Sequence, residues 1–327
     1  ELEDYFISIN EKKFRAVQVY EALYKRRVTS FDDMTNISKE VREKLKQDFS
    51  FYKIKMLIKQ QGKNVNKYLF ELEDGNKIET VLMFHDYGTS ICVSSQVGCN
   101  MTCAFCESGR LKKVRNLLAY EIVQQILQIE EDINKRITHV VLMGIGEPFD
   151  NYDNVLRFVK IINCGKGIDI GSRHITISTC GVIPGIKKFM NEEGQVNLAI
   201  SLHAPNDTLR SRIMPINKAY PLNELMETIK EYINKTNRRV TFEYIMLDNV
   251  NDSEENAKEL ALLLKGINCY VNLIPYNETE NIEFKRTKEW KIMKFYDILK
   301  KNKINVTIRK EFGGSVDAAC GQLRANN

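Results

Sequence analysis

Three cysteines close together in the chain carry the strongest chemical signal of the sequence. Cys99, Cys103 and Cys106 form the pattern Cys-x3-Cys-x2-Cys, which lets one loop wrap three thiolates around a compact inorganic core. Three ligands on a four-iron cluster leave one iron open to bind a substrate or cofactor. A structural zinc ion would instead need a fourth protein ligand, and no Cys or His follows within the next 30 residues. The spacing therefore favours a [4Fe-4S] cluster. The alternative is zinc with a distant fourth ligand, such as His139, His174 or His203.

The other five cysteines divide by position. Cys92 lies close to the three-cysteine motif, whereas Cys164, Cys180, Cys269 and Cys320 are scattered along the chain. Crowding of cysteines at short spacing indicates metal or redox chemistry, because structural disulfides are rare in the cytosol. No recognisable motif surrounds Cys164, Cys180 or Cys269, and we predict that these three are packing residues.

The elements that must hold the cysteine loop follow from the hydrophobic pattern. From residue 89 onward, short apolar segments alternate with amphipathic helices, and Ile122, Ile126, Ile129 and Ile133 show the helical spacing in one of them. Alternating strands and helices predict a parallel sheet covered by helices, and six such units predict a complete or partial β/α barrel. The chemistry of such a barrel lies at the carboxyl ends of its strands. The cysteine loop does follow the first expected strand.

The expected barrel strands are Ser90–Ser94, His139–Met143, His174–Ser178, Asn197–Leu202, Val240–Met246, Tyr270–Pro275 and Asn305–Arg309. The expected helices are Ala119–Asn134, Tyr152–Asn163, Ile183–Glu193, Leu222–Asn234, Ser253–Lys265 and Lys288–Asn302. Upstream, Lys67–Leu72 and Lys77–Met83 flank Asp74-Gly75, a turn signal that predicts a β-hairpin. Residues 1 to about 60 are polar, and we expect them to be helical, with helices through Phe14–Tyr24 and Lys39–Phe49.

We therefore divide the chain into four parts. These are a small N-terminal helical accessory domain (1–60), a β-hairpin extension (61–88), the barrel (89–310) and a C-terminal segment (311–327). The overall prediction is an α/β protein.

Polar or flexible residues follow the later strands, where the mouth of the barrel is expected. In Gly144-Ile145-Gly146-Glu147-Pro148 the glycines allow close approach of a ligand to the backbone, and Glu147 can accept a hydrogen bond from an amino group. An ordinary strand-exit turn explains this segment if it is taken alone. The other residues at strand ends are each better explained singly as loop caps, but together they form a ring: Ser178, Ser201, Leu202, His203 and Asn277.

The composition sets wide limits on partners. Of the 327 residues, 43% are hydrophobic and 28% are charged, which is typical of a globular protein with a buried core. No apolar stretch approaches the roughly 20 residues that cross a bilayer, and no basic-then-apolar leader is visible. We therefore expect a cytoplasmic protein with no membrane partner. A net charge of +5 and scattered basic clusters permit contact with nucleic acid, although solvated helix faces explain any single cluster equally well.

The cysteine loop, with the aromatic Phe105 before its third cysteine, resembles that of the radical S-adenosylmethionine (SAM) superfamily. The resemblance implies a partial (β/α)6 TIM-like barrel, with a [4Fe-4S] cluster on the three cysteines and SAM on the open iron. A longer series of motifs is similar to the RlmN/Cfr family of radical SAM 23S ribosomal RNA adenine methyltransferases. These motifs are Ile78-Glu79-Thr80-Val81, Cys92–Cys99, Met143–Pro148, Ser201–Pro205, Met214–Asn217 and Asp317–Leu323.

This family resemblance implies methylation of an adenosine in two stages that use two molecules of SAM. Cys320 would first accept a methyl group, and a 5′-deoxyadenosyl radical would then activate that group for addition to the adenine ring, whose C–H carbon has no easy polar route. Glu79 would take the ring proton, and Cys92 would form a transient disulfide with Cys320 to release the RNA. Without the resemblance, Glu79 is a surface carboxylate and the two cysteines are buried apolar residues. The residues that would bind SAM are Gly146, Glu147, Ser178, Ser201, Leu202, His203 and Asn277.

The resemblance also implies partners. The substrate would be 23S ribosomal RNA, gripped in part by the N-terminal helical domain, with transfer RNA as a second candidate. An electron donor such as flavodoxin would reduce the cluster, and we expect a monomer.

Two single residues bear on the surroundings of the cluster and on which carbon is methylated. Glu107 stands after the third cysteine, where a small residue is expected, and puts an unexplained charge near the cluster. Pro148 after Gly-x-Gly-Glu is typical of the branch that methylates carbon 2, whereas the antibiotic-resistance branch, which methylates carbon 8, tends to have Ala there. Carbon 8 methylation is thus the main alternative.

Two other functions are alternatives from outside this family. One is an RNA-binding or zinc-stabilised protein without catalysis. The other is a different radical enzyme such as a glycyl-radical activase, which leaves Cys92 and Cys320 without a role.

Overall fold

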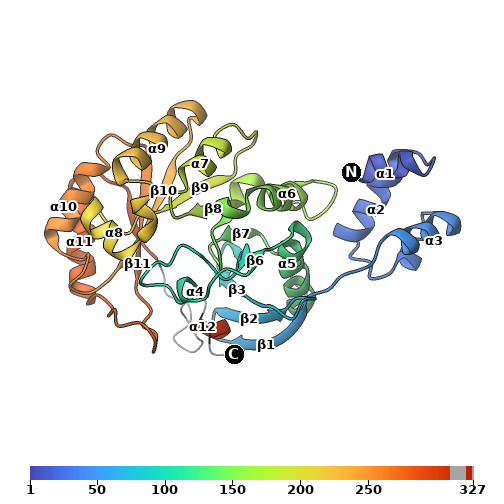
Figure 1. Cartoon of the computed structure of the whole chain (residues 1–327), viewed down its shortest axis with the longest axis horizontal. Helices are drawn as coiled ribbons and strands as arrows, with labels where there is room; N and C mark the ends of the chain where they lie inside the picture. The colour runs from blue at the N-terminus through green and yellow to red at the C-terminus, as the bar shows by residue number, and fades with distance from the viewer. Residues whose placement is uncertain (310–321, 326–327) are drawn as a thin grey trace.

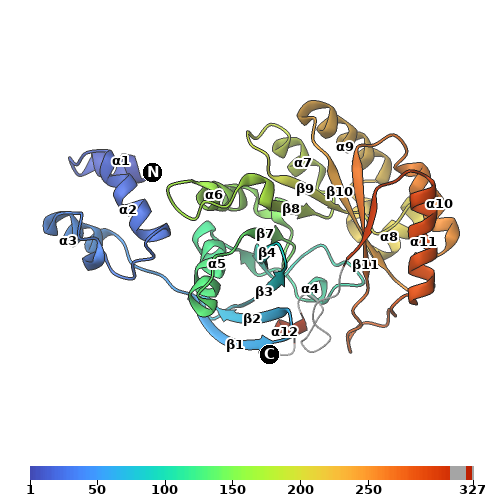
Figure 2. The ribbon, with the colours of Figure 1, turned by 180° about the vertical axis from the view of Figure 1, so that it is seen from behind.

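One mixed sheet forms the centre of the molecule. The computed structural model describes residues 1–309 and 322–325, and in this part of the chain the sheet has the strand order β1-β2-β3-β4-β7-β8-β9-β10-β11-β12. Strands β1 to β4 pair antiparallel, whereas every neighbouring pair from β4 to β12 is parallel. Figures 1 and 2 show the parallel part curving into an open barrel with helices on its outer side. The predicted α/β class, with a parallel sheet covered by helices, is confirmed.

The strands are β1 (Lys55–Gln61), β2 (Val65–Glu71), β3 (Lys77–His85), β4 (Gly88–Cys92), β5 (Gln96–Val97), β6 (Arg115–Asn116), β7 (His139–Leu142), β8 (Ile175–Thr179), β9 (Asn197–Ser201), β10 (Val240–Met246), β11 (Cys269–Pro275) and β12 (Val306–Ile308). The longer helices are α1 (Leu2–Ser8), α2 (Phe14–Tyr24), α3 (Lys39–Asp48), α5 (Ala119–Ile133), α6 (Tyr152–Asn163), α7 (Ile183–Phe189), α8 (Asp207–Ile213), α9 (Leu222–Thr236), α10 (Glu254–Leu263) and α11 (Glu289–Lys301). Four-residue helices are α4 (Glu107–Arg110) and α12 (Gln322–Ala325), and 3-10 turns are η1 (Phe31–Asp33), η2 (Pro148–Asn151), η3 (Ser172–His174) and η4 (Pro215–Lys218). None of the helices in the described ranges is both long and apolar enough to span a bilayer.

The barrel is held by a continuous apolar core between the strands and the outer helices. The apolar residues of α5 that recur at helical spacing pack into this core, as do alternate residues of β10 and β11. Each barrel strand predicted from the sequence is present, and β10 has the predicted bounds. The hairpin of β2 and β3 is also present, with Gly75 at a left-handed φ of 77° in its turn.

The N-terminal helices have an apolar cluster of their own. Ser30 caps η1 by accepting a hydrogen bond from the Asp32 N–H, and Ser38 caps α3 in the same way. The predicted helices through residues 14–24 and 39–49 are confirmed. Figure 1 shows this group beside α5 and α6. The hydroxyl of Tyr20 donates to the Ile161 carbonyl at 2.8 Å, and Arg27 pairs with Glu130 across the contact.

The expectation that residues 1 to 60 are helical throughout is wrong for the last of them. Residues 55–61 form β1, which pairs antiparallel with β2 at the outer edge of the sheet. Edge strands need no buried alternation, and the side chains of β1 are exposed or half-buried along its length. Lys59 pairs with Asp132 of α5 at 2.6 Å. Pairing with the next strand, rather than an apolar pattern, fixes the conformation here.

The buried core predicts a large loss of stability on truncation. Ile177 of β8 is fully buried, so Ile177→Ala should lower the free energy of unfolding by about 2–5 kcal/mol through lost burial and a residual cavity. Leu262 of α10 is 74% exposed, and Leu262→Ala should change it by no more than about 0.5 kcal/mol. Urea denaturation of both variants measures the difference, and equal losses would contradict the assignment of the core.

Candidate active site

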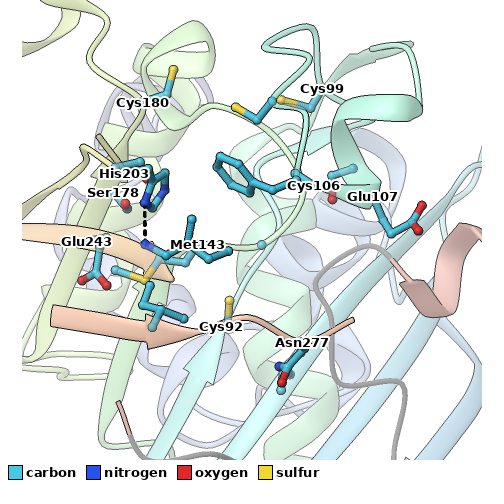
Figure 3. A pocket seen from close by; sticks show the side chains of 18 of the residues that line it. Cys92, Cys99, Cys106, Glu107, Met143, Ser178, Cys180, His203, Glu243 and Asn277 are labelled. Atoms are coloured by element: carbon cyan, nitrogen blue, oxygen red, sulfur yellow. Dashed lines mark hydrogen bonds between the residues drawn. The ribbon is translucent and has the colours of Figure 1, made fainter. Parts of the chain in front are cut away.

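A cavity of about 330 Å³ opens at the carboxyl ends of the parallel strands. Figure 3 shows Cys99 and Cys106 on the loop side of this space and Cys180 and His203 on the strand side. The residues predicted from the sequence that line the cavity are Cys92, Cys99, Cys103, Cys106, Gly146, Glu147, Ser178, Ser201, His203 and Asn277. Among the described residues, Leu202 and Glu79 were predicted for the site but do not line the cavity.

The cysteine loop is closed at its base by a small antiparallel pair, β5 and β6. Gly98 has φ +79°, and a Cβ there would lie 2.1 Å from the Lys112 carbonyl oxygen, so the loop closes only over a glycine. The Cys99 N–H donates to the Leu111 carbonyl at 2.9 Å. Arg115 of β6 binds both carboxylate oxygens of Glu121 at 2.7 and 2.8 Å, which anchors the end of the loop to α5.

The electrostatics of the three thiols fit a positively charged inorganic centre. Burial raises the pKa of Cys99 to about 12 and also raises the pKa values of Cys103 and Cys106. The charge of a neighbouring thiolate adds to the shift at Cys99 and Cys103, and the charge of Glu107 adds to it at Cys106. Three thiolates in one wall therefore need a cation between them. An iron–sulfur cluster supplies such a centre. The residues present therefore fit the predicted cluster.

Of the three histidines considered as a fourth zinc ligand, His139 and His174 lie at the wrong end of the strands, whereas His203 lines the same cavity as the cysteines. The rings of His139 and His174 stack with centroids 4.3 Å apart at the amino-terminal ends of their strands, whereas the cysteine loop follows the carboxyl end of β4. The Nδ1 atom of His203 accepts a hydrogen bond from the Ile245 N–H at 3.0 Å. In the described ranges, no three His, Cys, Asp or Glu side chains are grouped to hold a single metal ion.

The Gly-x-Gly-Glu segment packs directly against the start of the cysteine loop. A Cβ on Gly144 would lie 2.6 Å from the Val93 carbonyl oxygen, and Gly146 has φ +109°. The carboxylate of Glu147 accepts hydrogen bonds from the N–H groups of Phe149 (3.0 Å) and Cys180 (2.8 Å). Burial raises the pKa of Glu147, and these N–H bonds oppose the rise. The carboxylate is thus fixed in the cavity wall with accepting capacity left for a ligand.

The remaining strand-end residues differ in exposure to the cavity. Ser178 and Ser201 line it from β8 and β9, and Asn277 lines it after β11. Burial lowers the pKa of His203 to about 3, so this ring is neutral. It packs at a right angle to the ring of Phe105, with the centroids 4.9 Å apart. The side chain of Leu202 is buried in the apolar core, and its N–H donates to the Glu243 carbonyl at 3.1 Å.

One face of the hairpin forms another wall of the cavity. Lys67, Val81 and Cys92 stand in one row across β2, β3 and β4, and all three line the cavity. Burial raises the pKa of Cys92 to about 11. Glu79 lies next to this row and is 3% exposed, not on the surface, and its Oε1 atom is 2.8 Å from the Lys67 Nζ atom.

The segment that follows Cys320 in the sequence reaches the same face. Helix α12 packs against β2, β3 and α4, and the Leu323 N–H donates to Glu79 Oε1 at 3.2 Å. Cys320 itself lies outside the described residues. The seven cysteines within the described residues are all free. Because Cys320 is not among them, its disulfide with Cys92 stays a prediction.

The structure adds residues that the sequence pattern missed. Cys180, predicted to be a packing residue, is buried but lines the cavity. Glu107, whose role was unexplained, is 2% exposed in the wall with Arg110 3.8 Å away. Glu243 lines the cavity from β10 and accepts a hydrogen bond from Asn272 at 2.8 Å. A single charged residue within an apolar strand is the only signal that marks Glu243 in the sequence.

The barrel and the cysteine loop at its mouth define a radical SAM protein. The sequence model of the Radical SAM superfamily matches residues 93–261, and that of the ribosomal RNA large subunit methyltransferase N-terminal domain matches residues 1–50. A radical SAM methyltransferase from Sphaerobacter thermophilus superposes with a TM-score of 0.93 at 42% identity, covering 99% of this chain and 97% of that one. Streptococcus suis SuiB bound to S-adenosylmethionine, at 14% identity and a TM-score of 0.50, shares the fold alone over 67% of this chain and 50% of its own.

Proteins that are similar in sequence show which family of radical SAM proteins the chain belongs to. A protein of Spiroplasma citri named "Probable dual-specificity RNA methyltransferase RlmN" is 56% identical, over 97% of this chain and 92% of its own length. Proteins of the same name from Streptococcus thermophilus and Enterococcus faecalis are 55% and 54% identical, over 100% and 99% of this chain and 86% and 94% of their own. The chain belongs to the RlmN family of radical SAM enzymes. The family and the barrel fold predicted from the sequence are both confirmed.

The geometry of the cysteine loop predicts how it tolerates substitution. Gly98→Ala should prevent closure of the loop, because the added Cβ meets the Lys112 carbonyl at a φ that L side chains avoid. We expect the iron bound after anaerobic reconstitution to fall from about four per chain to a small fraction of that. Gly171→Ala is the matched control, since a Cβ there meets nothing within 4 Å. Full iron content in Gly98→Ala would contradict this account of the loop.

Proposed function

We propose that this protein is a radical SAM methyltransferase that methylates carbon 2 of an adenosine in 23S ribosomal RNA through an S-methylcysteine at Cys320. One observation carries the proposal at the level of residues. The three-cysteine loop and Cys92 line the same cavity, and the segment that follows Cys320 contacts Glu79 behind its wall. The name shared by the relatives, dual-specificity RNA methyltransferase, supports RNA as the substrate.

The cofactors follow from the superfamily and from the donor set. A [4Fe-4S] cluster would be held by Cys99, Cys103 and Cys106, and SAM would bind between the loop and the strand ends that carry Glu147 and Ser178. Together these groups supply a transferable methyl group and a one-electron cleavage that yields a carbon radical. The fixed carboxylate of Glu147 is an acceptor for an ammonium group, and the neutral ring of His203 offers an N–H donor from Nε2.

The residues of the chain handle the methyl group, the proton and the release. Cys320 accepts the methyl group as a thiolate and later carries it as a methylene bridge to the adenine ring. Glu79 takes the ring proton. Cys92 then attacks the sulfur of Cys320, so that the bridge becomes the methyl product while the two cysteines become a disulfide. The methylene carbon takes up a proton as its bond to sulfur breaks, and the two electrons that reduce this bond come from the two sulfur atoms as they form the disulfide. The single electron left on the ring after radical addition would be taken up by the cluster, which is the one-electron carrier of the site.

Each part of the chain has its own role in the proposed reaction. We propose that the helices of the N-terminal part (1–60), which end before β1, grip RNA and that the hairpin extension (61–88) supplies Glu79. The barrel (89–310) would hold the cofactors, and the C-terminal segment (311–327) would carry Cys320. We propose a cytoplasmic location, because ribosomal RNA is the proposed substrate. We further propose transfer RNA as a second substrate and an electron donor such as flavodoxin as a partner. We propose a monomer, since the predicted groups all come from one chain.

Carbon 8 methylation is the competing function. The high identity to proteins named RlmN over nearly their whole length favours carbon 2, as does Pro148, which begins η2 directly after Glu147. Mass spectrometry of ribosomal RNA fragments locates the added methyl group. A product methylated at carbon 8 alone would overturn this part of the proposal.

A labelled methyl group tests the pathway. With methyl-labelled SAM under anaerobic conditions, label should appear on Cys320 first and then on RNA, because transfer to the protein precedes transfer to the ring. Cys320→Ala should label neither. Cys269→Ala is the control, since Cys269 is buried at the amino-terminal end of β11 and lies outside the cavity wall. Direct labelling of RNA by Cys320→Ala would refute the two-stage pathway.

Removal of Cys92 tests the release step separately. Cys92→Ala should label Cys320 normally but stop after the first turnover, because no thiol remains to displace the bridged sulfur. RNA joined covalently to protein should accumulate and be detected on denaturing gels. Cys164→Ala, outside the cavity wall, should turn over normally. Repeated turnover in Cys92→Ala without an adduct would remove Cys92 from the mechanism.

A further inference from the structure

We propose that Lys67 is a positioning residue that holds Glu79 as a carboxylate and presents its Oε2 oxygen for proton abstraction. The inference rests on the proposed role of Glu79. It begins from a buried ion pair that links the wall of the cavity to the residue behind it.

The register of the hairpin brings Lys67 and Glu79 together. Lys67 lies opposite Val81 in the antiparallel pair of β2 and β3, and Glu79 stands two residues before Val81 on the same face. The Lys67 Nζ atom is 2.8 Å from Glu79 Oε1, with side-chain exposures of 2% and 3%. Charged side chains are almost never buried this deeply unless they are paired, because burial of an unpaired charge costs a large solvation free energy. Lys67 and Glu79 therefore depend on each other in this position.

The charged and titratable groups around Glu79 come from three elements. Lys67 faces it from β2, Cys92 from β4 and Arg324 from α12, and Arg309 lies farther along the cavity beside Cys92. Burial is the largest effect and raises the pKa of Glu79, and Lys67 is the largest opposing influence. The charge of Lys67 therefore does the most to keep this carboxyl group ionised.

The ion pair also determines which carboxylate oxygen of Glu79 is left to accept a proton. Glu79 Oε1 receives the Lys67 ammonium and the Leu323 N–H, whereas Oε2 is buried without a hydrogen-bond partner among the described residues. A buried acceptor with no partner is unusual, because each one costs solvation free energy. In the proposed step the ring C–H bond breaks, the proton bonds to Oε2, and the electron pair stays in the ring. Lys67 leaves that oxygen available.

Neutral replacements of Lys67 test this role in the reconstituted enzyme. Lys67→Met removes the charge that most opposes the effect of burial, so the pKa of Glu79 should rise further and a smaller fraction of its carboxyl groups should be ionised and able to accept a proton. RNA methylation at pH 7 should fall by about 100-fold, the lower end of typical general-base contributions. Because the base works only when deprotonated, the acid limb of the pH profile should move to higher pH, and activity should recover as the pH rises. Lys67→Arg should restore the profile.

A second readout separates this role from loss of folding. Methyl transfer to Cys320 makes no use of Glu79, so Lys67→Met should label Cys320 at the normal rate. If Lys67→Met does not fold, Lys67→Gln, which keeps a donor but no charge, should show the same shift. Lys55→Met is the matched control, because Lys55 forms an exposed pair with Glu71 in the same sheet and should leave both stages unchanged.

The outcomes distinguish the two proposals. If Glu79→Gln methylates RNA normally, the proposed role of Glu79 fails. If Glu79→Gln is inactive but Lys67→Met or Lys67→Gln keeps the wild-type pH profile, only the inference about Lys67 fails. In the Glu79→Gln background, Lys67→Met should cause no further loss, because the two residues act as one unit. An additional loss there would show that Lys67 acts independently, for example on an RNA phosphate, and would overturn the inference.

Discussion

Burial of negative charge is the constraint on which the site depends. Glu79, Glu147 and Glu243 are buried at or behind one cavity together with the thiols of the cysteine loop, and burial raises the pKa of each of these carboxyl groups. Such groups stay charged only where a donor or a cation opposes the cost of burial. Each carboxylate has a different partner: backbone N–H groups for Glu147, Asn272 for Glu243 and Lys67 for Glu79. The barrel must therefore close correctly before the charges balance.

Arg210 shows how the fold meets this demand. Its side chain is fully buried, and its guanidinium donates to the carbonyls of Cys180 at 2.7 Å and Ser201 at 3.3 Å, and to the Asn217 side chain at 2.8 Å. These contacts join the ends of β8 and β9 to the segment after α8. A cation placed behind the wall of thiols and carboxylates also lowers the cost of their charge. One side chain thus serves both the geometry and the electrostatics of the barrel mouth.

The features of the fold and site that could be predicted from the sequence are those that local patterns encode. Apolar strands, helical spacing and the cysteine spacing act within a few residues, and they led to the barrel and to the loop at its mouth. The pattern could not reveal that Lys67 pairs with Glu79, because strand register decides which side chains meet. It also missed β1, whose conformation comes from its neighbour, and it placed Leu202 in the site although its side chain belongs to the core. The errors arise where tertiary partners, not local sequence, determine the structure.

Strand β4 belongs at once to the hairpin sheet and to the barrel. It pairs antiparallel with β3 and parallel with β7, so the wall that carries Cys92 is hydrogen-bonded on both flanks. At the far end of the sheet, β12 has three residues and, within the described ranges 1–309 and 322–325, pairs with β11 alone. Backbone pairing is therefore uneven around the mouth, and β4, which is paired on both flanks, is a firmly fixed side of it.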